Sequence, residues 1–594
     1  MKQAKRHLLV LGCSSTKLQT EGGLPAIDRY DGPMYRVFRS FLRESIWPSP
    51  LSIAVLSAKY GLIGGLTSIE HYDQRMDRGR AQELSDTSTE TLVKWGKSHS
   101  QVSLVLGKEY LPALNLDRLS NQGVKSSIVE GPIGIKLNHV HNFLHHLQKT
   151  PRTNASAQTP KRPFYFLPDW DDMLDVNYDF KQDCFSSPTK AERDDQHCIR
   201  VMRPQRICDG VLVSLAQHLG SKGVLRRFAP TDVQSLAPQS IRDTFGLSSD
   251  QWAFGDCGAF SYVNERTPTI TVEQAVSLYQ IYGFDFGASV DHIPVTEVTV
   301  NDKKRTLYPN ERYERVRITR ENAARFLDLH KQRRCTFIPV GVIQGVTPIG
   351  YGRQLLEYAE MGYEHMGVGG LVPRSDAEIV EILKAIKKAK ASLRHKPWIH
   401  LFGVFRPRIQ EEIREAGITS FDSATYFRKA WLRSGQNYLA ADGNWYAAIR
   451  VPITSDPRTI KRLQQSGLPL DELKRLEKNA LRSLHRYAER RQSLDSTLAT
   501  IEQYDSILNR SDKHDNHDDD LIGAYRKTLI ARPWERCSCP VCSSLGIDVL
   551  IFRGCNRNKR RGAHNTLMLY HARGEQQEPS PQAQQLEAEV RPAA

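Results

Sequence analysis

The sequence lacks any apolar stretch near the ~20 residues that a membrane span requires. The apolar run at Leu8–Leu11 is shorter than the ~7–15 residues of an export signal. We therefore expect a cytoplasmic protein with no membrane partner. Cysteine is also scarce, with 10 residues among 594. In a long cytoplasmic chain these cysteines do not form a disulfide framework, and their clustering near the C-terminus indicates a metal.

Acidic residues are outnumbered, since 67 Asp and Glu stand against 82 Lys and Arg, for a formal net charge of +15. Such an excess attracts polyanions, of which nucleic acid is the commonest. A solvated basic surface is the alternative interpretation. The charge thus favours nucleic-acid binding but cannot distinguish DNA from RNA.

The length predicts two to four domains. Residues 1–147 alternate short apolar runs at Leu8–Leu11 and Ile53–Leu56 with a helical pattern at Met34–Glu44, which predicts a small α/β domain. Residues 148–163 are polar, contain proline and lack periodicity, so they are predicted to be a linker.

Residues 164–455 alternate strand and helix patterns, which predicts a parallel (β/α)8 TIM barrel, with a doubly wound sheet as the alternative. The helical patterns include Arg353–Met361 and Asp376–Ser392. The predicted strands are Gly210–Leu215, Trp252–Gly255, Phe284–Val290, Phe337–Ile343, Met366–Gly369, Ile399–Val404 and Thr419–Phe421.

Three segments complete the predicted α/β fold, in which a barrel with an inserted zinc-binding subdomain follows the small α/β domain. Residues 456–530 are predicted to be a basic helical insertion with an acidic loop, because apolar residues from Leu473 to Tyr487 repeat at helical spacing beside many Lys and Arg. This basic face either contacts phosphates or is only solvated. Residues 531–572 are the zinc-binding segment, and 573–594 are predicted to be a disordered tail.

The sharpest local motif is Cys537-Ser-Cys539-Pro-Val-Cys542. Three thiols within six residues can surround one soft cation, and Zn2+ takes four ligands at tetrahedral angles. We predict one structural zinc ion per chain. The first candidate for the fourth ligand is His564, with Cys555 and His571 as rivals.

Three aspartates, Asp256, Asp291 and Asp422, each follow an apolar strand pattern and enter a loop of small residues. The carboxyl ends of barrel strands are where such a fold places its working residues. Helix capping explains one such aspartate but poorly explains three, together with Gln344-Gly345 and Gly369-Gly370 at other strand ends.

These motifs resemble the tRNA-guanine transglycosylase superfamily. The resemblance is ordered along the chain and covers about 210–570. It rests on Asp256-Cys-Gly-Ala-Phe260, Asp291, Gln344-Gly-Val346, Val368-Gly-Gly-Leu371, Ser420-Phe-Asp-Ser423, Arg433-Ser-Gly-Gln-Asn437, the cysteine cluster and His564-Asn565.

The resemblance implies roles for these residues. Asp422 would be the nucleophile that holds the sugar, and Asp256 the acid/base that protonates the departing guanine. Asp291 and Gln344 would read the guanine edge, while Gly369-Gly370 would admit the flat base closely. Aromatic stacking on the base by Phe260 or Tyr262 is the less favoured alternative to a core position.

Some motifs depart from the tRNA enzymes. Ala424-Thr-Tyr-Phe-Arg428 replaces a Val-Leu-Pro-Thr-Arg segment, Cys257 replaces serine and Val346 replaces glycine. Together with Asp209–Ser214 these variants resemble the DpdA family, the DNA-guanine transglycosylases of 7-deazaguanine modification systems. That resemblance implies that 7-cyano-7-deazaguanine (preQ0) enters DNA, with an ATPase and a nitrile-processing enzyme as partners and with guanine flipped from the duplex.

Two other functions stay open at this point. A tRNA-guanine transglycosylase keeps the chemistry and changes the polymer. A catalytically silent DNA-binding or base-binding subunit keeps the fold, although intact Asp256 and Asp422 argue against it.

The N-terminal domain has motifs of its own. Cys13-Ser-Ser-Thr-Lys17 and Ser57-Ala-Lys59-Tyr-Gly-Leu62, with His71–Asp73, resemble a small domain of uncharacterised function. The first motif lacks the Gly-Lys-Ser/Thr ending of a P-loop. We expect Lys17 and Lys59 to contact a phosphate or a nucleic acid, and the alternative is that Cys13 and Ser57 only pack strand ends.

Overall fold

The computed structural model describes residues 6–45, 47–48, 50–147, 162–169, 171–216, 236–432, 434–454, 460, 469–509 and 521–572. The predicted tail at 573–594, the acidic loop at 511–520 and most of the predicted linker lie outside these ranges. The chain forms two compact units. The first comprises 1–160, 212–402 and 412–419, and the second comprises 161–211, 403–411 and 420–594.

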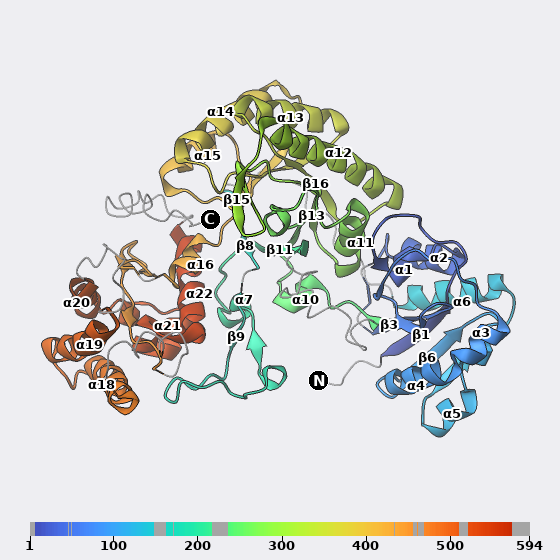
Figure 1. Cartoon of the computed structure of the whole chain (residues 1–594), viewed down its shortest axis with the longest axis horizontal. Coiled ribbons are helices and arrows are strands. Elements are labelled where there is room, and N and C mark those ends of the chain that lie inside the picture. The colour runs from blue at the N-terminus through green and yellow to red at the C-terminus, as the bar shows by residue number, and fades with distance from the viewer. Residues whose placement is uncertain are drawn as a thin grey trace. The chain divides into compact units, whose positions relative to one another are not determined.

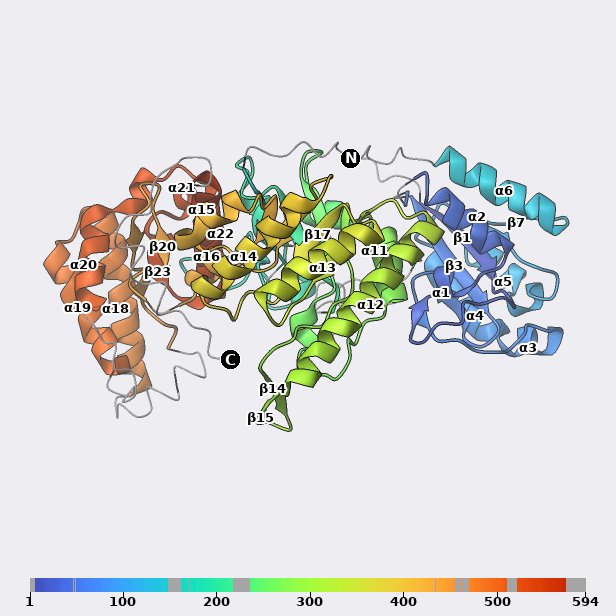
Figure 2. The same ribbon diagram turned by 90° about the horizontal axis from the view of Figure 1, so that it is seen from above.

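An α/β domain forms the N-terminal part of the first unit. Its five-stranded sheet has the order β4-β3-β1-β6-β7, in which only β4 is antiparallel to its neighbour. The strands are β1 (His7–Gly12), β3 (Leu51–Ser57), β4 (Gly61–Gly64), β6 (Gln101–Val105) and β7 (Ser126–Ile128). Helices α2 (Pro33–Phe41) and α6 (Ile133–His146) lie on one face, and α4 (Ser85–Gly96) and α5 (Leu116–Asn121) on the other (Figure 2). The predicted strands and helix of this region are confirmed.

The N-terminal domain packs against helix α11 (Val272–Tyr282) of the barrel. Gln274 Nε2 donates to the carbonyl oxygen of Gly23 at 2.8 Å, and Gln280 Nε2 donates to that of Leu42, also at 2.8 Å. Ser277 donates a buried hydrogen bond to Asp28 between these two contacts. One side of α11 therefore belongs to the interface with the N-terminal domain.

Eight strands form a closed parallel barrel, which confirms the predicted fold class (Figure 1). All seven predicted strands are present, with ends shifted by a few residues. The eighth, β8, is Phe164–Pro168, which the sequence patterns missed. The others are β11 (Gly210–Ser214), β12 (Trp252–Asp256), β13 (Phe286–Ala288), β16 (Ile338–Ile343), β17 (His365–Val368), β18 (Trp398–Leu401) and β19 (Ser420–Asp422). Helices α12 (Pro309–Arg333), α13 (Pro348–Met361), α14 (Asp376–Ser392) and α15 (Gln410–Glu415) connect strands.

The C-terminal part is helical. The predicted basic helix is confirmed as α18 (Leu470–Ala488), which α19 (Leu494–Asn509), α20 (Leu521–Ala531), α21 (Pro540–Leu545) and α22 (Gly554–Ala572) follow. Leu473, Leu476 and Ala480 are buried in α18. Arg475 pairs with Glu472 at 2.5 Å and Arg490 with Glu535 at 3.5 Å. Part of the basic face is thus neutralised within the protein.

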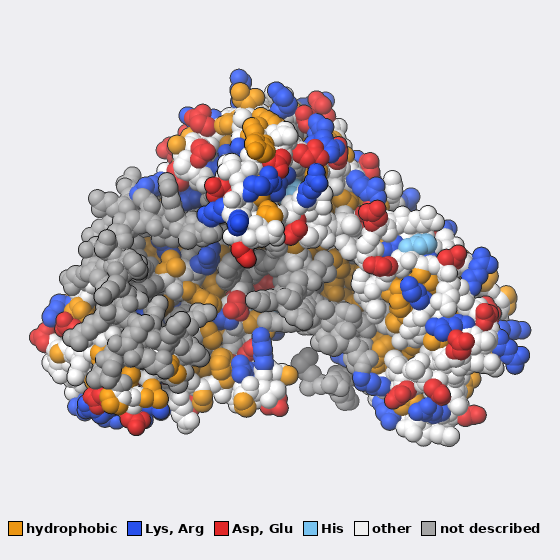
Figure 3. All heavy atoms as spheres, in the orientation of Figure 1, with side chains coloured by type: hydrophobic (Ala, Val, Ile, Leu, Met, Phe, Trp, Pro, Cys, Tyr) orange, Lys and Arg blue, Asp and Glu red, His pale blue; other side chains and the backbone are white. Residues whose placement is uncertain are grey.

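On the face drawn in Figure 3, basic and acidic side chains are intermingled over the N-terminal domain. Within the described ranges, no helix combines the length and apolarity that crossing a membrane would need.

Two barrel glycines give room to one buried ring. A Cβ atom at Gly255 would lie 2.2 Å from Tyr279 Cε1, and one at Gly287 would lie 2.5 Å from Tyr279 Cδ2. Tyr279 is fully buried on α11, and its hydroxyl donates to the carbonyl oxygen of Ala288 at 3.1 Å. The two glycines therefore let α11 approach β12 and β13 closely.

We predict that Gly255→Ala lowers the free energy of unfolding by about 1–3 kcal/mol, because the added methyl overpacks a rigid ring. Denaturant unfolding measures this change. Gly134→Ala is the matched control, since a Cβ atom there meets nothing within 4 Å. Equal stabilities of the two variants would contradict the packing argument.

Candidate active site and metal centre

A buried carboxylate lies just beyond β13. Asp291 is 3% exposed. Its Oδ1 accepts the Cys257 thiol at 2.8 Å, and its Oδ2 accepts Gln344 Nε2 at 2.6 Å. Burial raises the pKa of Asp291, while the two hydrogen bonds lower it. The structure therefore joins two predicted base-binding residues directly.

Cys257 and Tyr262 hold this carboxylate in place. Burial, followed by the nearby charges of Asp291 and Asp256, raises the pKa of the Cys257 thiol well above its usual value, so the thiol stays a donor. The Tyr262 hydroxyl lies 3.1 Å from Cys257 Sγ and donates to the carbonyl oxygen of Asp291 at 2.9 Å. Tyr262 is thus a buried support, whereas Phe260 is exposed.

Asp256 ends β12 beside the same group. Ligand atoms of Asp256, Cys257 and Asp291 all lie within 4.8 Å of one another. The amide of Gly258 donates to Asp256 Oδ2 at 3.0 Å and turns the chain in a left-handed conformation, with φ of +82°. The predicted acid/base and the predicted base-binding aspartate are therefore neighbours.

The Gln344 amide rests on two glycines at the end of β17. A Cβ atom at Gly369 would lie 2.3 Å from Gln344 Nε2, and one at Gly370 would lie 2.5 Å from Gln344 Oε1. Gly370 also has a positive φ of +69°. Gln344 Oε1 is buried and accepts no hydrogen bond from any described residue. These glycines are required by contact with Gln344, and the amide keeps one acceptor available.

Asp422 ends β19, in the second compact unit. It is 6% exposed, and its Oδ1 accepts the amide of Gly403 at 2.8 Å. Strand β8 pairs with β19, and the Tyr165 hydroxyl donates to the carbonyl oxygen of Ser423 at 2.9 Å. The predicted nucleophile thus has a fixed orientation at a strand end. Arg433, which begins a predicted motif, lies outside the described residues.

A second buried cluster of titratable residues lies at a strand end and was not predicted from the sequence. Asp169 directly follows β8, and ligand atoms of Asp169, Asp172 and His197 lie within 4.8 Å of one another. His197 Nδ1 is 2.7 Å from Asp172 Oδ1. The available signal was Asp169 after the apolar run Phe164–Leu167, the same arrangement as at Asp256.

The predicted metal ligands converge. Cys537, Cys539 and Cys542 place their sulfur atoms 3.6, 3.5 and 3.4 Å from His564 Nδ1. Tetrahedral zinc with ordinary Zn–S and Zn–N bonds separates such ligand atoms by about 3.6 Å. The cluster can hold a metal ion, and its geometry is compatible with zinc. The rivals Cys555 and His571 are exposed and lie outside the cluster.

Neighbouring groups orient the histidine. His564 Nε2 lies 2.7 Å from the carbonyl oxygen of Leu439, so Nδ1 faces the sulfur atoms. The Tyr438 ring stacks on the imidazole at 4.2 Å, and its hydroxyl is 3.3 Å from Cys542 Sγ. Four protein ligands would complete a tetrahedral shell around a bound ion, an arrangement typical of structural sites.

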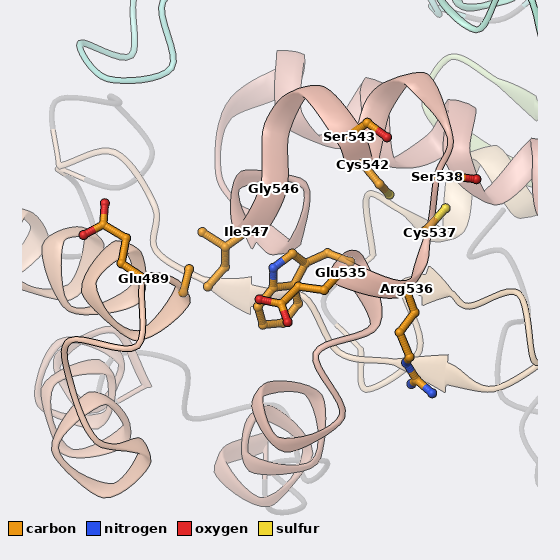
Figure 4. Close-up of a pocket in the computed structure, with 11 residues that line it drawn as sticks. Glu489, Glu535, Arg536, Cys537, Ser538, Cys542, Ser543, Gly546 and Ile547 are labelled. Atoms are coloured by element: carbon orange, nitrogen blue, oxygen red, sulfur yellow. The ribbon is translucent and has the colours of Figure 1, made fainter.

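A pocket of about 620 Å³ lies beside this cluster (Figure 4). Cys537 and Cys542 line it together with Glu489, Trp534 and Arg536. None of the residues predicted to bind or exchange a base lines it. The pocket therefore belongs to the metal-binding region.

The comparison with known proteins identifies the family. A DNA-guanine transglycosylase from Salmonella montevideo is 32% identical over 408 residues, which cover 68% of this chain and 95% of that relative. This chain belongs to the DNA-guanine transglycosylase family. The match confirms the family predicted from the motifs, and with it the predicted class of enzyme. No family model matches the chain.

We predict that a transglycosylase purified without chelators contains about one zinc ion per chain. His564→Ala should release it and unfold the C-terminal region, because a structural zinc stabilises the fold that it holds. Metal analysis and limited proteolysis test both effects. Cys555→Ser is the control, and a folded, metal-free wild-type sample would refute the prediction.

Proposed function

We propose that the protein exchanges guanine in DNA for preQ0 through a covalent aspartyl-glycosyl intermediate. The observation that carries the proposal is the buried Asp291–Gln344 pair resting on Gly369 and Gly370. Family membership gives the reaction class, and the name of the Salmonella relative supports DNA as the polymer.

Asp291 and Gln344 are suited to a purine edge. Guanine presents N–H donors at N1 and N2 beside the acceptor O6. The Asp291 carboxylate accepts such donors, and the Gln344 amide has a buried oxygen free of partners within the described chain. Glycines at 369 and 370 let the backbone pack directly against this amide, where any side chain would collide with it. A base that leaves these groups unpaired is disfavoured.

Asp422 acts as the nucleophile and Asp256 as the general acid and base. A parallel barrel carries its working residues at the carboxyl ends of its strands, and both aspartates end such strands. The Asp422 carboxylate attacks C1′ of the nucleotide, so that a C–O bond forms as the C1′–N9 bond breaks. Asp256 gives its proton to the departing guanine. It then takes a proton from N9 of the incoming base, which displaces Asp422 from C1′.

Two inversions at C1′ retain the sugar configuration, as a modified polymer requires. The oxocarbenium-like transition state is stabilised by the Asp422 carboxylate, which the Gly403 amide orients. Zinc at Cys537, Cys539, Cys542 and His564 supports the fold and takes no part in these steps.

A tRNA substrate is the second candidate function. The segment Ala424–Arg428, which lacks Val-Leu-Pro-Thr-Arg, argues against it. DNA in turn requires that guanine leave the duplex, at a cost of a few kcal/mol. An ATPase partner is suited to that opening, and a nitrile-processing enzyme would modify the inserted base.

We predict that Asp422→Ala lowers base exchange by at least about a thousandfold while nucleic-acid binding persists, because only the covalent step is lost. Asp256→Asn should also stop turnover but permit a trapped sugar adduct, which intact-mass spectrometry detects. Asp302→Asn, on an exposed turn with φ of +60°, is the matched control. Substantial exchange by Asp422→Ala would show that the nucleophile is another residue.

Incorporation of labelled preQ0 tests whether DNA or tRNA is the substrate. We expect it to enter duplex DNA, with the ATPase partner supplied, and not a guanine-bearing anticodon loop. Nucleoside mass spectrometry of both polymers gives the readout. Incorporation into tRNA alone, with the partner present, would replace the first function by the second.

A further inference from the structure

The N-terminal domain gathers reactive side chains at one edge of its sheet. Strand β1 lies between β3 and β6, so the chain leaves β1 on one side and later returns on the other. In open parallel sheets such a switch point, outside the carboxyl ends of the strands, is where ligands bind. Cys13 follows β1, Ser57 ends β3 and Tyr110 follows β6.

Hydroxyl groups connect these strand ends. Ser57 is fully buried, and its Oγ accepts the Tyr30 hydroxyl at 3.1 Å and lies 2.9 Å from the Tyr72 hydroxyl. The two tyrosine oxygens are themselves 2.7 Å apart. Across β1, the Tyr110 hydroxyl donates to the carbonyl oxygen of Cys13 at 2.9 Å and lies 3.3 Å from Cys13 Sγ.

Lys17 brings a buried positive charge into this group. The residue is 8% exposed, and its Nζ lies 4.3 Å from the centre of the Tyr72 ring and 5.9 Å from that of Tyr30. Within the described part of the chain it forms no ion pair and no hydrogen bond. Burial lowers the pKa of Lys17, the nearby groups of Cys13 and Asp73 raise it, and the charge of Arg75 lowers it. A largely buried lysine whose ammonium group forms no ion pair is costly, because charges inside proteins are normally paired.

A second lysine faces the same ring. Lys59 Nζ lies 5.6 Å from the centre of the Tyr72 ring and 5.2 Å from that of Tyr60. Tyr60 is 39% exposed, unlike Tyr30 and Tyr72. The cluster therefore combines two cations, several hydroxyl groups and one accessible aromatic face.

We propose that this cluster binds the phosphate of a small phosphorylated ligand, with Lys17 as the counter-ion and Lys59 as the outer contact. The class that fits is a nucleoside 5′-phosphate, whose base can stack on Tyr60 while its phosphate reaches Lys17. The site is separate from the guanine-exchange residues and independent of the proposed function.

The burial of Lys17 favours a phosphate monoester over the phosphodiesters of a nucleic-acid backbone. Lys17 has almost no exposed surface, so only a terminal phosphate that enters the cluster reaches it. A backbone phosphodiester is flanked by sugars on both sides and would reach Lys59 at most. The hydroxyls of Ser14 and Thr16, in the same loop as Lys17, are further donors for a monoester.

Calorimetric titration of the full chain tests the proposal with inorganic phosphate, 5′-mononucleotides, the matching nucleosides and a short DNA duplex. We expect the mononucleotides to bind and the nucleosides not to bind. Lys17→Met should weaken mononucleotide binding by at least about tenfold, the loss of one charge-assisted contact. Lys125→Met is the control, because Lys125 is exposed and precedes β7 at the opposite edge of the sheet.

Unfolding measurements exclude misfolding as the cause. Without ligand, Lys17→Met should unfold at the same or a higher temperature than the wild type, because an unpaired buried charge is gone. Absence of mononucleotide binding at millimolar concentration would overturn the proposal. So would equal affinity of wild type and Lys17→Met, or Lys17-dependent binding of the duplex alone.

Discussion

Closure of the barrel is the constraint on which the other features depend. Strand β8 pairs in register with β19, so that Phe166 lies beside Asp422 although 256 residues of sequence separate them. A parallel barrel carries its working residues at the carboxyl ends of its strands, and Asp256 and Asp422 both end such strands. Closure also explains why small residues are needed at Gly255 and Gly287, since a helix must lie close to strands that cannot move apart.

The candidate site contains a buried carboxylate, that of Asp291. Burial disfavours the charged form of Asp291, and the thiol of Cys257 and the amide of Gln344 offset part of that cost. A substrate that donates to this carboxylate would recover the remainder. Under the proposed function, the same burial would disfavour a base that offers Asp291 no hydrogen-bond donor.

Much of this arrangement could be predicted from the sequence. Apolar runs gave seven of the eight strands, and the cysteine spacing with His564 gave the metal cluster. Strand β8 escaped because Phe164–Pro168 contains a proline and follows a polar segment. The role of Tyr262 could not be predicted either, since its hydrogen bonds to Cys257 and Asp291 depend on tertiary contacts between β12 and β13. The buried state of Lys17 likewise depends on two tyrosines distant in sequence.

Helix α11 makes contacts with both the barrel strands and the N-terminal domain. Tyr279 fills the space above two barrel glycines, while Gln274, Ser277 and Gln280 bond to the N-terminal domain. A truncation that removed residues 1–147 would leave Ser277 and its neighbours facing solvent on a helix that positions β12 and β13. The N-terminal domain therefore cannot be removed without exposing part of the barrel. A fragment that contains only the barrel and the C-terminal part would need polar substitutions on α11 before its activity could be compared with that of the whole chain.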